Sequence, residues 1–400
     1  MNRLHPRLCE AVAEALFEIF YEKNYADKVI EKTLKKDRRW GARDRAFIAS
    51  NTYDIVRYGR LYWEILGYQP KKVPGWWQIL GIHLMHQGHI LPNWKEFSGL
   101  KDKKIQLGLN KKDWPLKVKE SIPDWMDTIG NEVFKEKWAP IIHALNEPAK
   151  VILRTNTLLN SREDLKTALA HEGIDTYEIG EEGLVLKDRK NVFKTEAFKE
   201  GWFEVQDASS QKVGHFLEVE PGMRVIDACA GAGGKSLHLA ALMKNKGQII
   251  SMDTEAWKLK ELAKRAKRAQ AFLIQGKEIE NNKTIKRLEK SADRLLLDVP
   301  CTGMGVLRRN PDAKWKLSPK FLEEVQTTQK EILENYSKMV KPGGKMVYAT
   351  CSILPAENED QVNAFLKENG NSFELEKQET ILPHEEGFDG FFMALLKRKD

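Results

Sequence analysis

Two cysteines, Cys301 and Cys351, stand fifty positions apart, and each follows an apolar run typical of a buried strand. Pro300 and Gly303 beside the first, and Ser352 beside the second, favour turns where those strands end. A cysteine thiolate is a strong nucleophile, and strand ends of an open parallel sheet meet at one edge. The spacing therefore predicts a site with two thiols, although a free cysteine is more often a small buried residue.

A glycine-rich turn lies upstream of both cysteines, at residues 227–235. An apolar run precedes it and a helical pattern follows, so its glycines and the free N–H groups of the helix favour a nucleotide-like ligand. A phosphate-binding P-loop would need a glycine where Cys229 stands, and a dinucleotide fingerprint would need one at Ser236. S-adenosylmethionine has no pyrophosphate to seat, so its site fits this turn best.

Asp253 ends the next predicted strand, 22 positions after Gly231. A carboxylate at that place can accept hydrogen bonds from both ribose hydroxyls of a nucleoside. The alternative interpretation of Asp253 is a helix cap.

The thiols and the cofactor turn together indicate methyl transfer to a nucleic-acid base. Carbon-5 of cytosine is a weak nucleophile, and addition of a thiolate to carbon-6 activates it. This chemistry needs a cysteine, an acid near N3 and a base that removes the carbon-5 proton. Asp298 stands at the same strand end as Cys301 and is the candidate acid, whereas we interpret Cys229 as a packing residue.

The elements that position these residues alternate from Asp207 onward, as in a parallel sheet covered on both faces. We expect strands at 223–227, 248–253, 271–275, 293–298 and 345–350, and helices at 235–243, 255–268, 319–339 and 356–368. Two further strands, 373–380 and 391–397, flank a turn. The sequence predicts an α/β fold, a doubly wound methyltransferase sheet that ends in an antiparallel hairpin.

We expect three domains. Residues 1–119 have a helical pattern, 120–205 have the mixed texture of a small α+β subdomain, and 206–400 form the methyltransferase domain. The net charge of +7 permits a polyanionic partner. No apolar run is long enough to span a membrane, and the four cysteines are too sparse for a disulfide framework or a zinc cage. We expect a cytoplasmic monomer with no metal.

Several motifs of residues 225–400 resemble the RsmB/Nop2/Sun family of RNA cytosine-5 methyltransferases. They are residues 227–235, Asp298-Val-Pro-Cys-Thr-Gly303, 308–312 with Lys314-Trp315, Tyr348-Ala-Thr-Cys-Ser352 with Glu357-Asn-Glu359, and Asp389-Gly-Phe-Phe392. Residues 120–205 are similar to the small RNA-binding subdomain of the family. Residues 1–115, with Arg43-Asp-Arg-Ala-Phe47, resemble the NusB-type helical domain of its RsmB branch.

The resemblance implies roles for these residues. Cys351 is the attacking nucleophile, Cys301 assists release of the methylated RNA, and Asp298 contacts the cofactor or the target base. S-adenosylmethionine is the implied cofactor, held by Cys229, Ala230, Gly231, Ala232, Gly233, Gly234, Lys235, Asp253, Lys258 and Asp298. The implied substrate is ribosomal RNA of the small subunit, converted to 5-methylcytosine during rRNA processing.

One departure concerns the acid that many members carry after the third strand to bind adenine. Here the stretch is Gln275-Gly-Lys-Glu-Ile279, with no aspartate in register, and Glu278 is the only candidate substitute. Basic residues of the helix at 255–268 are candidates for phosphate contacts, as are Arg308 and Arg309.

Two alternative functions remain at this stage. An exocyclic-amine methyltransferase also carries a motif, an Asp/Asn-Pro-Pro-aromatic turn, at the end of its fourth strand. Direct attack by an amine needs no cysteine, so the paired thiols count against this alternative. A non-catalytic RNA-binding assembly factor would bind cofactor and transfer no methyl group.

Overall fold

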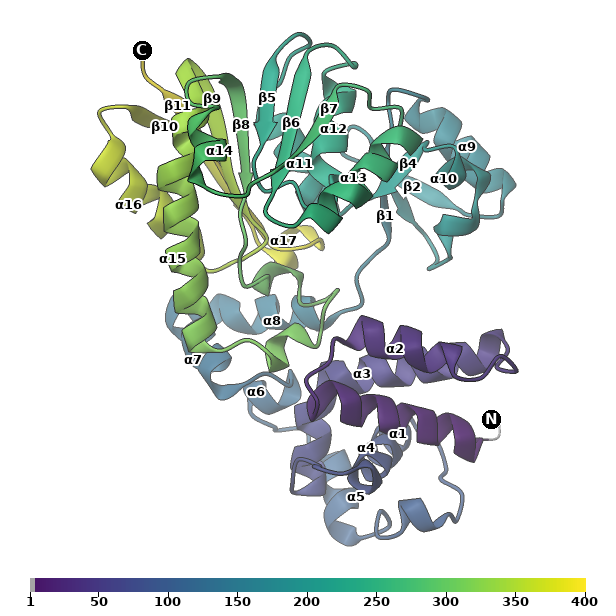
Figure 1. Cartoon of the computed structure of the whole chain (residues 1–400). Coiled ribbons are helices and arrows are strands. Elements are labelled where there is room, and N and C mark those ends of the chain that lie inside the picture. Colours follow the sequence, from purple (N-terminus) through teal and green to yellow (C-terminus); the bar gives the residue numbers. More distant parts are fainter. Residues whose placement is uncertain (1–3) are drawn as a thin grey trace. The chain divides into compact units, whose positions relative to one another are not determined.

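Seven strands of the C-terminal half form one mixed sheet, in the order β10-β11-β9-β8-β5-β6-β7 (Figure 1). They are β5 (Arg224–Asp227), β6 (Gln248–Asp253), β7 (Ile274–Glu278), β8 (Ala292–Asp298), β9 (Val340–Thr350), β10 (Phe373–Ile381) and β11 (Phe391–Arg398). Strands β5 to β9 pair in parallel, and the hairpin of β10 and β11 joins β9 in antiparallel fashion. The computed structural model describes residues 4–400 and confirms the predicted α/β sheet with its terminal hairpin.

Apolar residues that alternate along the strands make a core on each face of this sheet. Val225, Leu296 and Val347 face α11 (Ala208–Phe216), α12 (Gly234–Leu242) and α13 (Ala256–Arg268). Their neighbours Ile226 and Leu295 face the other helices, α14 (Asn282–Lys286), α15 (Pro319–Tyr336) and α16 (Glu359–Asn369). The short helix α17 (Pro383–Glu386) lies between the hairpin strands. The sheet is therefore the middle layer of three.

The third parallel strand begins three residues later than predicted, at Ile274. The apolar residues before it form the turn after α13 instead: the Ala271 N–H donates to the Ala266 carbonyl at 2.9 Å, and Ala271 and Leu273 are buried there. An apolar residue that closes a helix cannot be told from the start of a strand by pattern alone.

A second, antiparallel sheet of four strands precedes the first along the chain, in the order β2-β3-β1-β4. Its strands are β1 (Ile152–Thr155), β2 (Thr176–Ile179), β3 (Gly183–Leu186) and β4 (Phe203–Val205), with helices α9 (Arg162–His171) and α10 (Glu196–Lys199). Ser161 caps α9 and exchanges hydrogen bonds with Asp164, as the predicted capping box requires.

The N-terminal region is helical. Its elements are α1 (Pro6–Phe20), α2 (Ala26–Lys35), α3 (Ala42–Leu66), α4 (Val73–His86), α5 (Lys103–Asn110), α6 (Leu116–Lys119), α7 (Asp124–Phe134) and α8 (Trp138–Asn146). In the part of the chain that the structure describes, no helix is long and apolar enough to cross a membrane.

The chain forms two compact units. The helical unit runs to Glu147 and also contains residues 307–318, while 148–306 and 319–400 form the other unit. Helix α3 holds the segment after α6, because the Ser121 hydroxyl accepts from the Leu61 N–H and Arg60 donates to the Ile122 carbonyl. The segment 116–147 therefore packs with the helices before it, and the division into three domains stays a prediction.

Candidate active site

The structure brings the two predicted thiols together. Cys301 follows β8 and Cys351 follows β9, and these neighbouring parallel strands end in register, with Asp298 opposite Ala349. The two sulfur atoms lie 3.3 Å apart, within hydrogen-bond distance for sulfur, and both residues are half-buried. A thiol in one of them can therefore donate to the sulfur of the other.

The Cys301 thiol is held protonated. Its hydrogen bond with Cys351, followed by burial, raises the pKa of Cys301 well above its ordinary value. A thiol with a raised pKa stays protonated near neutral pH, so Cys301 can donate a hydrogen bond to the sulfur of Cys351.

A buried carboxylate, Glu357, joins the two cysteine loops. Its oxygens accept from the Thr302 N–H at 2.8 Å, the Thr302 hydroxyl at 2.6 Å and the Ser352 hydroxyl at 2.5 Å. Gln329 of α15 adds a bond at 3.1 Å. Thr302 and Ser352 each follow one of the cysteines, so a single side chain fixes the loops against each other. Glu357 belongs to one of the motifs in the sequence, but this positioning role was not predicted.

The glycine-rich turn between β5 and α12 has the backbone that its sequence predicts. Gly233 has a positive φ of 86°, and a Cβ there would stand 2.6 Å from the Leu262 side chain. Any larger residue would push the turn away from α13. Arg265 of α13 also donates to the Ala232 carbonyl at 2.8 Å.

Asp253 links this turn to the next helix. One carboxylate oxygen accepts from the Gly231 N–H at 2.9 Å, and the other accepts from the Glu255 N–H at 2.9 Å. Asp253 therefore fixes both the glycine turn and the backbone just before α13, whose N-cap residue is Glu255 and not Asp253. A carboxylate has about four acceptor sites, so two remain for ligand hydroxyls.

A cavity of about 300 Å³ lies beside Asp253, at the lower end of the range for small-molecule sites. Of the predicted cofactor residues, Cys229, Asp253 and Lys258 line it, and Pro300 brings it next to Cys301. The Lys258 ammonium lies 3.9 Å from Asp253 and 2.8 Å from Glu255. An acceptor carboxylate and apolar walls suit the ribose and adenine of S-adenosylmethionine. The other predicted cofactor contacts, residues 230–235 and Asp298, do not line this cavity.

Asp298 pairs with Lys235 at the carboxyl edge of the sheet, with 2.5 Å between nitrogen and oxygen. Lys235 opens α12 and also stands 5.1 Å from the ring centre of Phe391. Behind this pair, burial raises the pKa of Asp227 to about 7, and the Ser236 hydroxyl donates to it at 2.6 Å.

Sequence reasoning missed the wall that α15 contributes to this cavity. Thr328, Glu331, Ile332, Asn335 and Tyr336 line it, a spacing of three and four that places them on one helix face. Ile279 and Asn282 close the side where an adenine acid was sought, while Glu278 is exposed and does not line the cavity. The helical spacing of these residues can be read from the sequence, but the cavity that they line depends on the packing of α15 in the fold.

Two expectations about basic residues need correction. Arg308 is 4% exposed and donates to the Ala144 carbonyl at 2.8 Å inside the helical unit, so it is not a surface contact for RNA. Arg265 and Arg268 of α13 both pair with Glu204 of β4. In each case the arginine side chain joins two segments of the fold through a hydrogen bond or an ion pair.

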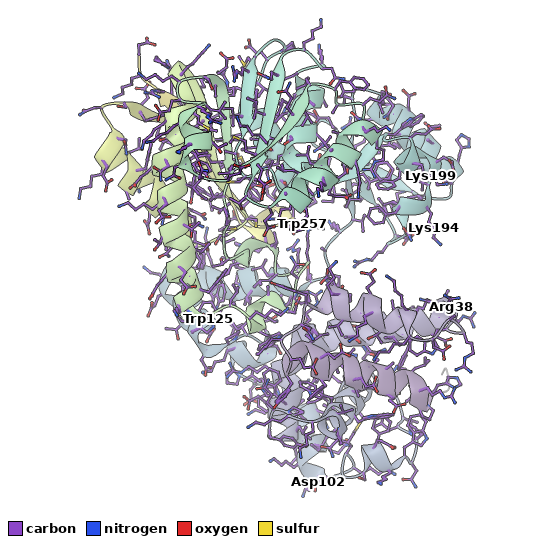
Figure 2. The ribbon with its side chains drawn as sticks, in the orientation of Figure 1. Arg38, Asp102, Trp125, Lys194, Lys199 and Trp257 are labelled. Atoms are coloured by element: carbon purple, nitrogen blue, oxygen red, sulfur yellow. The ribbon has the colours of Figure 1, made fainter. Side chains whose placement is uncertain are left out.

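The exposed face of α13 keeps its basic residues. Lys260, Lys264 and Lys267 are exposed there, and Trp257 in the first turn is 65% exposed (Figure 2). An exposed aromatic ring among lysines is a surface on which a nucleic-acid base can stack.

Two family descriptions match this chain. Residues 215–397 match the one described as 16S rRNA methyltransferase RsmB/F, and residues 122–193 match the ferredoxin-like domain of RsmF/B-like methyltransferases. Among solved structures, that of PH0851 has a TM-score of 0.82 and 26% identity over 99% of both chains. A methyltransferase homolog protein from Pyrococcus horikoshii has a TM-score of 0.63 and 26% identity over 71% of this chain and 98% of its own.

Curated relatives extend the likeness. A Synechocystis protein named "Probable ribosomal RNA small subunit methyltransferase B" is 34% identical over 302 residues, which cover 70% of this chain and 67% of that protein. The ribosomal RNA small subunit methyltransferase B of Vibrio cholerae is 34% identical over 69% of this chain and 65% of its own. The match thus spans about two thirds of these relatives. The resemblance inferred from the motifs is confirmed, and the chain belongs to the RsmB/F family of methyltransferases.

Proposed function

We propose that this chain transfers a methyl group from S-adenosylmethionine to carbon-5 of a cytosine in RNA, through a covalent adduct of Cys351 with carbon-6. The observation that carries the proposal is the pair of sulfur atoms 3.3 Å apart at the ends of β8 and β9. The cofactor supplies an electrophilic methyl group, and a thiolate next to its cavity supplies the activation that a cytosine ring needs.

The two cysteines have different tasks in this proposal. Cys351 forms a bond to carbon-6 and so makes carbon-5 electron-rich. After methylation, carbon-5 gives its proton to a base, and the bond between Cys351 and carbon-6 breaks to restore the ring and the thiolate. Cys301, which is protonated and within hydrogen-bond distance of Cys351, is placed to assist this release.

Asp298 and Lys235 are the charged groups at the same edge. Asp298 would contact N3 of the base, or its carboxylate would accept from the amino group of the cofactor, and Lys235 is its ion-pair partner in this structure. Asp253 would hold the ribose, and Gly231 to Gly234 would let the cofactor approach the backbone. Cys229 and Lys258 would complete the cavity wall.

The proposed substrate is small-subunit ribosomal RNA, because the curated relatives bear that name. A base inside a duplex cannot reach a sheet edge, so the target cytosine must be unpaired or flipped, which costs a few kcal/mol of unstacking. The lysines of α13 with Trp257 are the proposed surface for the flanking nucleotides. The NusB-like role of the helical unit stays a prediction.

The test is covalent capture of RNA. Cys301→Ala is expressed in cells and purified under denaturing conditions, and attached RNA is measured, with Cys351→Ala, the double variant and Cys9→Ala alongside. Cys9 is buried in the helical core and serves as the matched cysteine control. We expect RNA on Cys301→Ala only, and sequencing of the adduct then locates the cytosine.

Loss of the adduct from Cys301→Ala with cognate RNA present would contradict the proposed mechanism. Methyl transfer by Cys351→Ala would then favour an exocyclic amine as the target. Cofactor binding with no methyl transfer by the wild-type chain to any RNA would favour a non-catalytic assembly factor.

A further inference from the structure

A cluster of three metal-ligand side chains lies away from the thiols, between the four-stranded sheet and the helices of the larger sheet. Glu182 stands in the turn between β2 and β3, His215 near the end of α11 and His238 in the middle of α12. Their ligand atoms all lie within 4.8 Å of one another. The cluster is independent of the proposed active site, since none of its residues lines the cavity beside Asp253.

The distances in the cluster fit a small metal ion. A carboxylate oxygen of Glu182 lies 3.0 Å from Nε2 of His215 and 3.7 Å from Nε2 of His238. Bonds of about 2.0–2.1 Å in a tetrahedral zinc site place neighbouring ligand atoms about 3.3 Å apart. The two distances from Glu182 are therefore close to the spacing of ligand atoms around a zinc ion.

Hydrogen bonds within the protein do not explain why the imidazole of His238 is buried. It is 1% exposed, and neither of its ring nitrogens has a hydrogen-bond partner. Buried polar groups in native proteins nearly always have partners. Its Nε2 points to Glu182, so a bound ion would give this imidazole the partner that it lacks.

Two features hold the ligands in place. The ring of His238 packs against Gly214 of α11, where a Cβ would stand 2.5 Å from Nδ1. The Glu182 carbonyl accepts from both the Thr155 N–H at 2.9 Å and the Thr155 hydroxyl at 2.7 Å. The backbone of each element is therefore fixed before any ion binds, which lowers the cost of assembling the site.

The cluster also has an opening. Glu182 and His215 line a cavity of about 370 Å³, and the His215 side chain is 32% exposed. An ion can enter by this route, and a water molecule from the cavity can complete four-fold coordination. Glu181, whose carboxylate lies 3.7 Å from Nδ1 of His215, adds negative charge at the entrance.

We propose that Glu182, His215 and His238 bind one divalent ion of the zinc class, with a water molecule as fourth ligand. Two imidazoles and one carboxylate suit zinc and its first-row neighbours, whereas magnesium prefers oxygen ligands only. The ion would tie the small sheet to α11 and α12. Because α12 starts at the glycine turn, the ion would also brace the cofactor side of the sheet. Sequence analysis expected no metal because it counted cysteine spacings.

The test is metal binding by the full chain, with no RNA or cofactor present. Protein treated with a chelator is titrated with zinc by calorimetry, and cobalt is used to obtain the visible absorption of a four-coordinate site. We expect one zinc per chain, a melting temperature raised by several degrees, and no competition from magnesium. Glu182→Gln and His215→Ala should each weaken zinc binding at least tenfold.

His171→Gln is the matched control, since His171 is exposed on α9 in the same unit. It should bind zinc as the wild type does. His238→Gln removes the buried ligand and should also weaken zinc binding. If His238→Gln fails to fold, His215→Ala still tests the site, because His215 is half-exposed. Absence of zinc binding by the wild type would overturn the proposal. So would equal binding by the Glu182 and His215 variants, or competition by magnesium.

Discussion

The sulfur atoms of Cys301 and Cys351 lie 3.3 Å apart across the ends of two neighbouring strands. Two cysteines that were buried independently would not meet in this way. Residues fifty positions apart come together here through the register of β8 and β9. It also exposes the site to oxidation, since a disulfide needs an S–S distance of about 2.0 Å and a small approach of the two loops suffices.

Mild oxidation should therefore join the two cysteines and block the site. Diamide would take two electrons and two protons from the thiol pair, and the disulfide would leave Cys351 unable to attack a base. We expect a Cys301–Cys351 peptide in mass spectrometry, loss of methyl transfer, and recovery of both thiols and activity after dithiothreitol. In Cys9→Ala the same peptide should form, whereas an unlinked pair after diamide treatment would contradict the geometry.

Glu357→Gln should impair catalysis more than cofactor binding. The carboxylate accepts from four donors, and an amide has only one acceptor oxygen, so the Thr302 and Ser352 loops lose part of their tie. A misplacement of about 1 Å can cost roughly 100-fold in rate. We expect kcat to fall about 10- to 100-fold with little change in cofactor affinity.

The control for this positioning role is Asp360→Asn, an exposed acid three residues further along the chain. Its steady-state constants should match the wild type. An unchanged kcat in Glu357→Gln would show that the loops keep their places without the carboxylate.

Asp253→Ala should weaken the binding of S-adenosylmethionine at least tenfold in calorimetry. The substitution removes the proposed ribose acceptor and also the bond to the Gly231 N–H that fixes the turn. Glu255→Gln is the matched control, because its side chain pairs with Lys258 at the surface. Equal affinity in Asp253→Ala and wild type would show that this carboxylate does not hold the ribose.

Local patterns were sufficient to predict the sheet, the glycine turn and the meeting of the thiols. The strand that ends at Asp298 and the one that ends at Thr350 each carry an apolar run closed by turn residues. Parallel pairing then brings their ends together. The observed strands agree within two residues, except that β7 starts and ends three residues later than predicted and β9 starts five residues earlier.

What the sequence could not predict depends on packing between distant segments. Glu357 has its role only because Thr302 and Ser352 come within reach from two loops. Arg308 looked like a surface residue near the thiols, yet the segment that carries it belongs to the helical unit. No local pattern distinguishes a basic residue in a loop from one that is buried against another element.

Lys314→Met should destabilise the helical unit. The Lys314 ammonium is 1% exposed and donates to the Arg57 carbonyl at 2.6 Å and to Asn146 at 3.1 Å. Methionine would fill the space and leave these acceptors unpaired, at a cost of about 3 kcal/mol. Nine of the eleven tryptophans lie in this unit, so the urea midpoint by tryptophan fluorescence reports on it.

Lys320→Met is the control for this change, since the Lys320 side chain is 83% exposed. Its urea midpoint should stay within error of the wild type. A Lys314→Met midpoint equal to that of the control would show that other groups or water satisfy these acceptors.

Asp227→Asn should change how stability depends on pH. Burial raises the pKa of Asp227 to about 7, whereas an unfolded aspartate has a pKa of about 3.9. Between about pH 4 and pH 7 the folded chain keeps a proton that the unfolded chain has released, so this group makes the free energy of unfolding fall as pH rises. The slope is at most about 1.4 kcal/mol per pH unit, and the effect levels off above pH 7.

Asparagine has the same shape as aspartate and cannot ionise, so Asp227→Asn isolates this effect. The wild type should therefore lose stability relative to Asp227→Asn between pH 4 and pH 7 and hold a constant difference at higher pH, in urea titrations followed by circular dichroism without cofactor. Parallel curves for the two proteins over this range would mean that Asp227 ionises in the folded chain as easily as in the unfolded one.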